Sequence, residues 1–436
     1  MPRNLNPTRY LVALLIGLAL TACTPTGTTS EAQAPTPVAD LSRAAPEAVG
    51  LSSERLERLS AAMQGLVDEG RLAGITTLIA RHGKVAHFGT FGAQDMEAGK
   101  PMAEDTIFRI YSMTKPVTSV ALMLLYEEGR FRLSDPVEKY IPEFKDLPVA
   151  VGEDENGIVT EPADHPMTIR ELMSHTAGLS YGIFSESPVD KLYREAEILH
   201  PDSTLRDMIE DLAAIPLRQQ PGTVWHYSVA VDVQGYLVEV LSGQPFDEFL
   251  KERIFDPLGM KDTGFWVPPE KADRFAQVYV YDENGALMRP EGEPMRRKDF
   301  LSPVNFPSGG GGLVSTTMDY ARFCQMLLNG GTLDGVRLLA PSTVAMMHRN
   351  QMPRGVPEYS RGRGFGLNFG VVLDPVEADG ISKGEYYWGG IAGTWFWIDP
   401  LENLIFVGMI QQFGENRPHM RSLSRRLTYQ AIVGDG

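Results

Sequence analysis

The sequence predicts an α+β fold in which both ends of the 436-residue chain contribute to one antiparallel sheet. Two observations support this prediction. A helical pattern and two β-rich runs open the globular part, and two β-rich runs and a helical pattern close it. Between them, apolar helical patterns alternate with stretches rich in proline and glycine, which indicates a mainly helical lobe. Two lobes are expected at this length, because a single hydrophobic core rarely grows so large.

The N-terminal elements are a helix and a hairpin. Apolar residues recur on one helical face at Leu56, Leu59, Met63, Leu66 and Val67. The run "GITTLIARHGKVAHFGTFG" then gives two β-rich segments about an "RHGK" turn, which is typical of a β-hairpin.

Three helices are expected in the middle of the chain. "VTSVALMLLYEEG" ends at Gly129, "TIRELMSHTAG" runs from Thr168 to Gly178, and "VDVQGYLVEVLSG" is closed by Gly243. We assign residues 112–301 to the helical lobe.

The C-terminal elements complete the sheet. "YYWGGIAGTWFWIDP" and "NLIFVGMIQQF" are β-rich runs joined by a "DPLEN" turn, and a helix around "MRSLSRRLTYQAIV" follows. Residues 46–111 and 302–436 are therefore assigned to one α/β lobe.

The first residues have the pattern of an export signal. Arg3 and Arg9 precede the apolar run "YLVALLIGLALTA", which is shorter than a membrane-spanning helix requires. The run leads into "LTAC", which resembles the lipobox of bacterial lipoproteins and implies lipidation of Cys23. We expect a signal peptide over 1–22 and a flexible Thr/Pro/Ala-rich tether over 23–45. The mature protein would be a lipoprotein anchored through Cys23 to a membrane of the cell envelope, facing the periplasm. The alternative is an ordinary cleaved signal with an incidental cysteine.

Composition excludes several classes of function. The net charge of −16 gives no basic footprint, so nucleic-acid binding is not expected. Besides Cys23 the chain has Cys324, which lies in an amphipathic helical pattern and is interpreted as a buried apolar residue. The eight histidines show no metal-binding spacing, and Gly309–Gly312 lacks the Gly-Lys-Ser/Thr of a phosphate loop. No metal and no cofactor are expected.

Two serines are candidate nucleophiles. Ser180 in "GLSYG" fits G-x-S-x-G, but a nucleophile elbow needs a strand before the serine and a helix after it. The order here is the reverse, so Ser180 is interpreted as a loop serine. Ser112 and Lys115 in "IYSMTKPVTS" form the S-x-x-K of the chain, a pattern that chance produces about one or two times at this length.

The Ser112–Lys115 pair has a structural and a catalytic interpretation. In the structural interpretation, Ser112 caps the following helix, as serines at such positions commonly do. Residues three apart on a helix share a face, however, so an amine there can reach the hydroxyl. The start of a helix also stabilises developing negative charge.

Two further segments bear on the choice. Tyr227 in "QPGTVWHYSV" stands where a loop enters a helix, although a tyrosine in isolation is more often a packed aromatic. Trp388, Gly389 and Gly390 lie in a β-rich run, where glycines mark a bulge or the close approach of a ligand or another backbone.

In this order, the three elements resemble the serine β-lactamase and penicillin-binding-protein superfamily over about Glu47–Val433. "SMTK", "YSV" and "WGG" resemble more narrowly the family VIII carboxylesterases, which share the class C β-lactamase fold. The resemblance implies a β-lactamase-like fold, an antiparallel sheet flanked by helices plus a mainly helical lobe. It also implies serine hydrolysis without a cofactor.

The resemblance implies a role for each matching residue. Ser112 is the nucleophile, and Lys115 and Tyr227 share the proton transfers, with the identity of the base left open. The backbone N–H groups of Ser112 and Ile391 form the oxyanion hole, and Gly389 and Gly390 permit close approach of the strand.

Two departures point to the substrate. Val229 stands where β-lactamases often have an asparagine that holds the antibiotic's amide, and Trp388 stands where they have the lysine that helps hold its carboxylate. We therefore expect small-molecule carboxylic esters, with short acyl chains, as substrates. The alternatives are a β-lactamase or D-amino-acid peptidase, and a non-catalytic envelope protein on the same fold. The sequence leaves the oligomeric state open.

Overall fold

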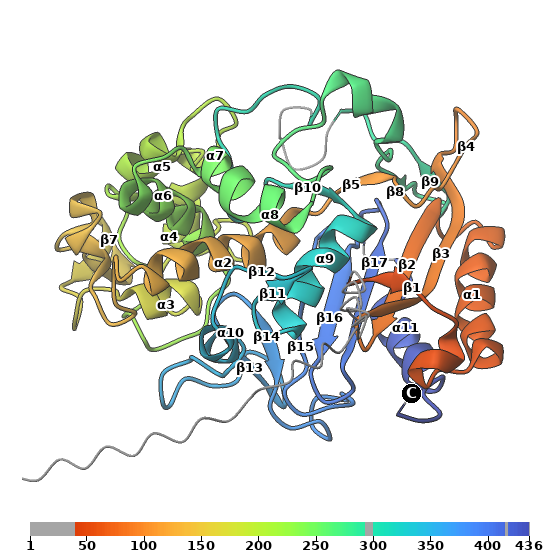
Figure 1. Cartoon of the computed structure of the whole chain (residues 1–436). Helices are drawn as coiled ribbons and strands as arrows, with labels where there is room; N and C mark the ends of the chain where they lie inside the picture. Colours follow the sequence, from red (N-terminus) through yellow and green to blue (C-terminus); the bar gives the residue numbers. More distant parts are fainter. Residues whose placement is uncertain (1–39, 293–299, 415–416, 436) are drawn as a thin grey trace, which may run out of the picture. The chain divides into compact units, whose positions relative to one another are not determined.

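A nine-stranded sheet built from both ends of the chain organises the fold (Figure 1). The computed structural model describes residues 40–292, 300–414 and 417–435. The strand order is β1-β3-β2-β17-β16-β15-β14-β13, with β4 paired to β3. The strands are β1 (Ser42–Arg43), β2 (Gly74–Arg81), β3 (Lys84–Asp95), β4 (Lys100–Pro101), β13 (Arg363–Phe365), β14 (Gly370–Val372), β15 (Tyr386–Gly389), β16 (Trp395–Asp399) and β17 (Leu404–Met409). Apart from the parallel β1–β3 pair, neighbouring strands are antiparallel, so the predicted sheet is confirmed.

The sheet has a hydrophobic layer on each face, because side chains alternate along its central strands. On β17, Ile405 and Val407 belong to the main core, while Leu404 and Phe406 belong to a second cluster. Helix α9 (Thr317–Leu328) covers the main-core face (Figure 1). Helices α1 (Ser53–Asp68) and α11 (Met420–Tyr429) cover the other face (Figure 1).

The helical part centres on α2 (Thr114–Glu127) and α6 (Ala230–Ser242), which pack against each other. Both helices are buried on nearly all sides, which explains their almost uninterrupted apolar sequences. The remaining helices are α3 (Ile169–Met173), α4 (Pro188–Glu195), α5 (Leu205–Leu212), α7 (Phe246–Leu250), α8 (Asp256–Leu258) and α10 (Pro341–Met347).

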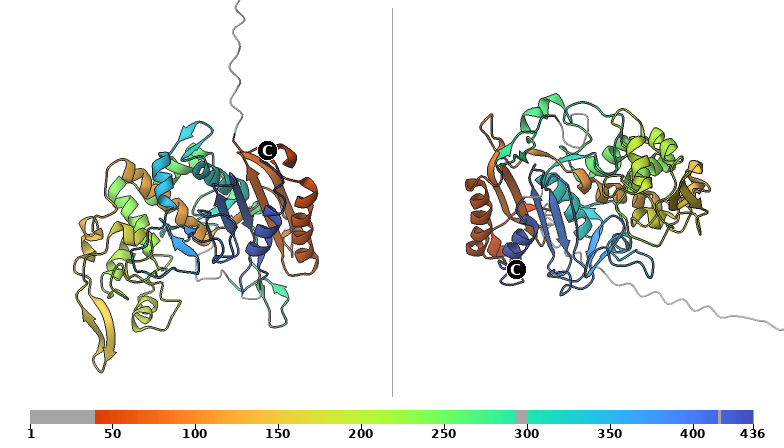
Figure 2. Two further views of the ribbon diagram at one scale, coloured as in Figure 1. Left: turned by 90° about the horizontal axis from the view of Figure 1, so that it is seen from below. Right: turned by 180° about the vertical axis from the view of Figure 1, so that it is seen from behind.

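Among the described residues, eight short strands form four further two-stranded sheets. They are β5 (Ile107–Arg109) with β10 (Val314–Thr316), β6 (Val149–Asp154) with β7 (Gly157–Glu161), β8 (Val280–Tyr281) with β9 (Leu287–Met288), and β11 (Thr332–Leu333) with β12 (Val336–Arg337). The β6–β7 hairpin projects from the helical part (Figure 2). No helix in the described part of the chain is long and apolar enough to cross a membrane.

Several predicted boundaries were wrong. Residues 40–45 were assigned to the tether, but Leu41 is buried and Ser42–Arg43 pair with β3. The helix expected from Thr168 to Gly178 ends at Met173, because His175 has a positive φ of 56° that breaks the helix. The β-rich run containing Trp388 is two strands, β15 and β16, joined by a turn at 390–394.

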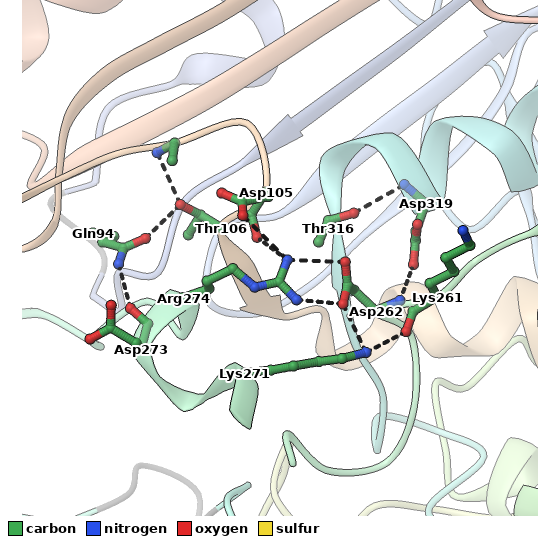
Figure 3. Close-up of polar contacts among 11 residues, drawn as sticks. Gln94, Asp105, Thr106, Lys261, Asp262, Lys271, Asp273, Arg274, Thr316 and Asp319 are labelled. Atoms are coloured by element: carbon green, nitrogen blue, oxygen red, sulfur yellow. Dashed lines mark hydrogen bonds and ion pairs between the residues drawn. The ribbon is translucent and has the colours of Figure 1, made fainter. Parts of the chain in front are cut away.

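Residues 275–279, which were assigned to the helical lobe, pair with residues assigned to the α/β lobe. Phe275 forms a bridge with Ile107, and Tyr279 forms one with Gln412. A polar network holds this segment against β5 and α9 (Figure 3). In it, the Arg274 guanidinium donates to both carboxylate oxygens of Asp262, and the Asp262 N–H donates to Asp319 at 2.7 Å.

Candidate active site

Ser112 lies on a tight connection between strand β5 and helix α2. A 3₁₀ turn over Tyr111–Met113 follows the strand, and Tyr111 adopts a positive φ of 43°, a conformation unfavourable for a bulky residue. A hydrogen bond from the Ile110 N–H to Leu313 O, at 3.0 Å, holds this connection. This strained turn places the partly exposed Ser112 at the start of a buried helix.

Lys115 lies one turn later and is fully buried. Its Nζ is 3.3 Å from Ser112 Oγ, 2.8 Å from Tyr181 Oη and 2.5 Å from Gly310 O. It also lies 4.5 Å from the centroid of the Tyr227 ring. No acidic side chain forms an ion pair with Lys115 anywhere in the described ranges. Neutral oxygens and aromatic faces therefore surround this amine.

Tyr227 comes from the segment that leads into α6, as predicted. Its ring contacts those of His175, Tyr181 and Trp388, with centroid distances of 4.9, 5.3 and 5.5 Å. Its hydroxyl accepts a hydrogen bond from Trp388 Nε1 at 3.3 Å. The structure thus brings Ser112, Lys115 and Tyr227 together, with the face of Tyr227 toward the amine and its hydroxyl beside Trp388.

The end of β15 closes against the nucleophile turn. A Cβ on Gly390 would lie 2.4 Å from Ile110 O, so only glycine allows this approach. The Gly390 N–H donates to Thr394 O at 2.8 Å, and Thr394 Oγ1 donates to Ile110 O at 3.3 Å. The Ile391 N–H donates to no acceptor in the described part of the chain, which leaves it available to a ligand.

The Gly309–Gly312 segment forms another wall of the site. A Cβ on Gly310 would lie 2.5 Å from Asp232 Oδ2 and 2.9 Å from Tyr181 Oη. Asp232, buried on α6, accepts hydrogen bonds from Ser308 Oγ at 2.5 Å and from the Gly310 N–H at 3.0 Å. Because the Gly310 carbonyl accepts from Lys115, Asp232 fixes the loop that holds the amine.

These segments enclose a cavity of about 1000 Å³. Ser112, Tyr227, Trp388, Gly389, Gly390 and Ile391 line it together with mainly aromatic and aliphatic side chains. Three arginines also line it, namely Arg194, Arg417 and Arg421. Arg417 Nη1 donates to Ile391 O at 2.7 Å, and the Arg421 guanidinium occupies the space where a Gly389 side chain would project. The cavity is thus apolar with positive charge at the end of β15.

Sequence reasoning missed Tyr181, Asp232 and Arg421. Tyr181 directly follows the serine of "GLSYG", and Asp232 is one of two acids in an apolar helical run. Both positions can be seen in the sequence. Only the fold, however, shows that Tyr181 contacts Lys115.

Other candidate residues lie elsewhere. Val229 is fully buried before α6 and does not line the cavity. Ser180 is buried in a loop, as predicted. Cys324 is buried on α9, and burial raises the pKa of its thiol. Cys23 lies outside the described residues. Within those residues, no cluster of metal-ligating side chains occurs.

Comparisons with known proteins agree with this geometry. The model of the family described as Beta-lactamase matches residues 59–429. Protein Rv1367c of Mycobacterium tuberculosis is 37% identical over 370 residues, which cover 82% of this chain and 90% of the relative. Esterase EstB of Burkholderia gladioli is 33% identical over 375 residues, which cover 80% and 89%.

A solved structure shows the same fold. EstCE1, described as a hydrolase with promiscuous acyltransferase activity, has a TM-score of 0.73 and 28% identity, over 88% of this chain and 98% of that one. The extent of these matches and the Ser112–Lys115 site together show that the chain belongs to the β-lactamase family.

Proposed function

We propose that this protein is a serine hydrolase that cleaves carboxylic esters, with short acyl chains as the first substrates to test, through an acyl-enzyme on Ser112. The observation that carries the proposal is the 3.3 Å contact between Ser112 Oγ and Lys115 Nζ inside the cavity-forming turn. The similarity to Esterase EstB and to the hydrolase EstCE1 supports the choice of esters.

Acylation begins with attack by Ser112 Oγ on the ester carbonyl. Lys115 takes the serine proton, since no other described side chain lies within hydrogen-bonding distance of this hydroxyl. The N–H groups of Ser112 and Ile391 stabilise the oxyanion, a contribution of about 3 kcal/mol for each such donor. As the carbon–alkoxide bond breaks, Tyr227 gives a proton to the leaving alcohol and is reprotonated from Lys115. In deacylation, Lys115 takes a proton from the water that attacks the acyl carbonyl. The bond from the carbonyl carbon to Oγ then breaks, the carboxylic acid leaves, and Lys115 returns the proton to Ser112 Oγ.

The test combines covalent labelling with turnover. A fluorophosphonate probe is expected to label Ser112, and Ser112→Ala is expected to abolish both labelling and hydrolysis of p-nitrophenyl acetate. Ser180→Ala is the matched serine variant and is expected to remain labelled at Ser112. Full hydrolysis by the Ser112→Ala protein would refute the proposal, and nitrocefin turnover above ester turnover would favour a β-lactamase.

We also propose that Cys23 is lipidated and that the mature protein is anchored at the periplasmic face of an envelope membrane. The support is the "LTAC" sequence after an apolar run. Cys23→Ser is expected to move the protein from the membrane fraction to the soluble fraction. Labelling with a fatty-acid analogue that is unchanged in this variant would contradict the proposal.

A further inference from the structure

Ser180 belongs to the loop that carries Tyr181 and links it to the segment that carries Tyr227. Its N–H donates to Tyr193 Oη at 3.2 Å, and its carbonyl accepts from the Val229 N–H at 3.1 Å. Its hydroxyl contacts Asp190 on α4 and lies 3.1 Å from His226 Nε2. One serine therefore joins its own loop, α4 and the residues on both sides of Tyr227.

The proton count assigns a direction to each of these bonds. The Ser180 hydroxyl donates its single proton to Asp190, which is a carboxylate and can only accept. The hydroxyl therefore accepts from His226 Nε2–H, and from the Gly182 N–H at 3.3 Å. Burial and then Arg218 lower the pKa of His226, which agrees with a neutral ring protonated at Nε2. The bonding capacity of this hydroxyl is then filled, which leaves it unsuited to nucleophilic attack.

Asp190 is firmly anchored. Its second oxygen accepts from Ser185 Oγ and from Ser187 Oγ, the latter at 2.7 Å, and Arg218 lies 3.9 Å away. Burial alone would raise the pKa of Asp190, but these hydroxyls and the guanidinium together lower it. The carboxylate thus gives Ser180 a fixed attachment point.

The two tyrosines beside this link both face Lys115. Tyr181 adjoins Ser180 and accepts from Lys115 Nζ at 2.8 Å, while Tyr227 adjoins His226 and lies over the same amine. We propose that Ser180 is a positioning residue whose hydrogen bond to His226 holds Tyr181 and Tyr227 in place around Lys115. This inference rests on the proposed function, because it assigns Ser180 a part in the same ester hydrolysis.

The expected effect is on turnover. Catalytic groups displaced by about 1 Å lose on the order of 10²-fold in rate, whereas an apolar cavity of this size continues to bind substrate. Ser180→Ala is therefore expected to lower kcat for p-nitrophenyl acetate by about tenfold or more, with KM within about twofold. It is also expected to shift the acidic limb of the kcat/KM–pH profile.

Ser185→Ala is the matched control. It also removes a hydroxyl from Asp190, but within the described residues the Ser185 hydroxyl forms no hydrogen bond with His226, Tyr181 or Tyr227. We expect it to lower stability, measured by thermal unfolding, about as much as Ser180→Ala while kcat and the pH profile stay near wild type. Equal kinetics in the two variants would overturn the inference.

A second pair of variants keeps the test decisive if Ser180→Ala fails to fold. His226 is only partly buried, and His226→Gln retains an N–H donor for Ser180 whereas His226→Leu does not. We expect His226→Gln to retain most of the kcat that His226→Leu loses. Equal kcat in these two variants would also overturn the inference. Failure of the proposed function is a separate outcome, because it appears as activity that survives in Ser112→Ala.

Discussion

At the scale of single residues, the buried Lys115 amine contacts two tyrosines, Tyr181 and Tyr227, in different ways. Tyr181 accepts a hydrogen bond from Lys115. The ring face of Tyr227, by contrast, lies against the amine, and the Tyr227 hydroxyl lies beside Trp388 at the cavity wall. A hydroxyl at the wall can reach a leaving alcohol, and one bonded to the amine can orient it. We infer different roles for the two tyrosines.

Replacing each tyrosine by phenylalanine tests this difference. Tyr227→Phe is expected to lower kcat for p-nitrophenyl butyrate by about 10²-fold or more, because it removes the proton donor to the alcohol. Tyr181→Phe removes one hydrogen bond to Lys115 and is expected to cost about tenfold. Steady-state kinetics measure both, and Tyr126→Phe on α2 is the control. Near-normal kcat in Tyr227→Phe would contradict its assigned role.

Arg421 sets a second prediction at this scale. Its guanidinium lies beside Gly389 in the cavity and forms no side-chain hydrogen bond or ion pair with any described residue. Arg421 is exposed to the cavity, and loss of hydration beside the surrounding protein, followed by the like charge of Arg417, lowers the pKa of Arg421, so an anion there would be favoured. We expect kcat/KM to be higher for p-nitrophenyl hydrogen succinate than for p-nitrophenyl butyrate.

The arginine variant isolates this charge effect. Arg421→Gln is expected to lose about 10- to 100-fold in kcat/KM on the succinate monoester, the range of a charge-assisted hydrogen bond, and little on the neutral ester. Arg426→Gln is the control, because Arg426 is an exposed arginine of the same helix that does not line the cavity. Equal losses on both esters in Arg421→Gln would refute the prediction.

At the scale of elements, the sequence predicted the helices and hairpins that hydrophobic periodicity and glycines at their ends indicate. Gly243 ends α6, and the "RHGK" turn joins β2 to β3, as expected. The predicted helix end was wrong at α3, because the positive φ of the single residue His175 ends the helical backbone. The sequence also failed to place Tyr181 on Lys115, because that contact depends on the direction of a buried side chain rather than on any local pattern.

Arg274 provides a prediction for the segment that returns to the sheet (Figure 3). Its guanidinium holds Asp262, which is about four-fifths buried, and also donates to Asp105 O at 3.1 Å. Arg274→Ala leaves the Asp262 carboxylate with Lys271 alone, so a loss of about 1–3 kcal/mol in the free energy of unfolding is expected. Urea unfolding measures it, with exposed Arg206→Ala as control. Because the network lies outside the cavity, KM is expected to change little, and unchanged stability would contradict the role.

At the scale of the whole molecule, stability depends on ionisable groups that folding removes from water. Burial lowers the pKa of His87 to about 4, and burial raises the pKa of Asp319 to about 6. The two groups act in opposite directions. Protonation of the unfolded His87 destabilises the fold as pH falls from about 6.5 to 4, whereas loss of the proton from unfolded Asp319 destabilises it as pH rises from about 4 to 6.

Asp319→Asn separates the two contributions, because His87 is common to both proteins. Burial is the main cause at Asp319, with Asp262 adding to it and the Asp262 N–H, Thr263 and Arg322 opposing it. The wild type loses stability relative to the variant as pH rises through this window, by on the order of 2–3 kcal/mol at about 1.4 kcal/mol per pKa unit. Urea unfolding at pH 4, 5, 6 and 7 measures the difference, and exposed Asp211→Asn controls for the removal of one charge. A wild-type-minus-variant difference that stays constant across these pH values would show that Asp319 does not retain its proton in the folded state.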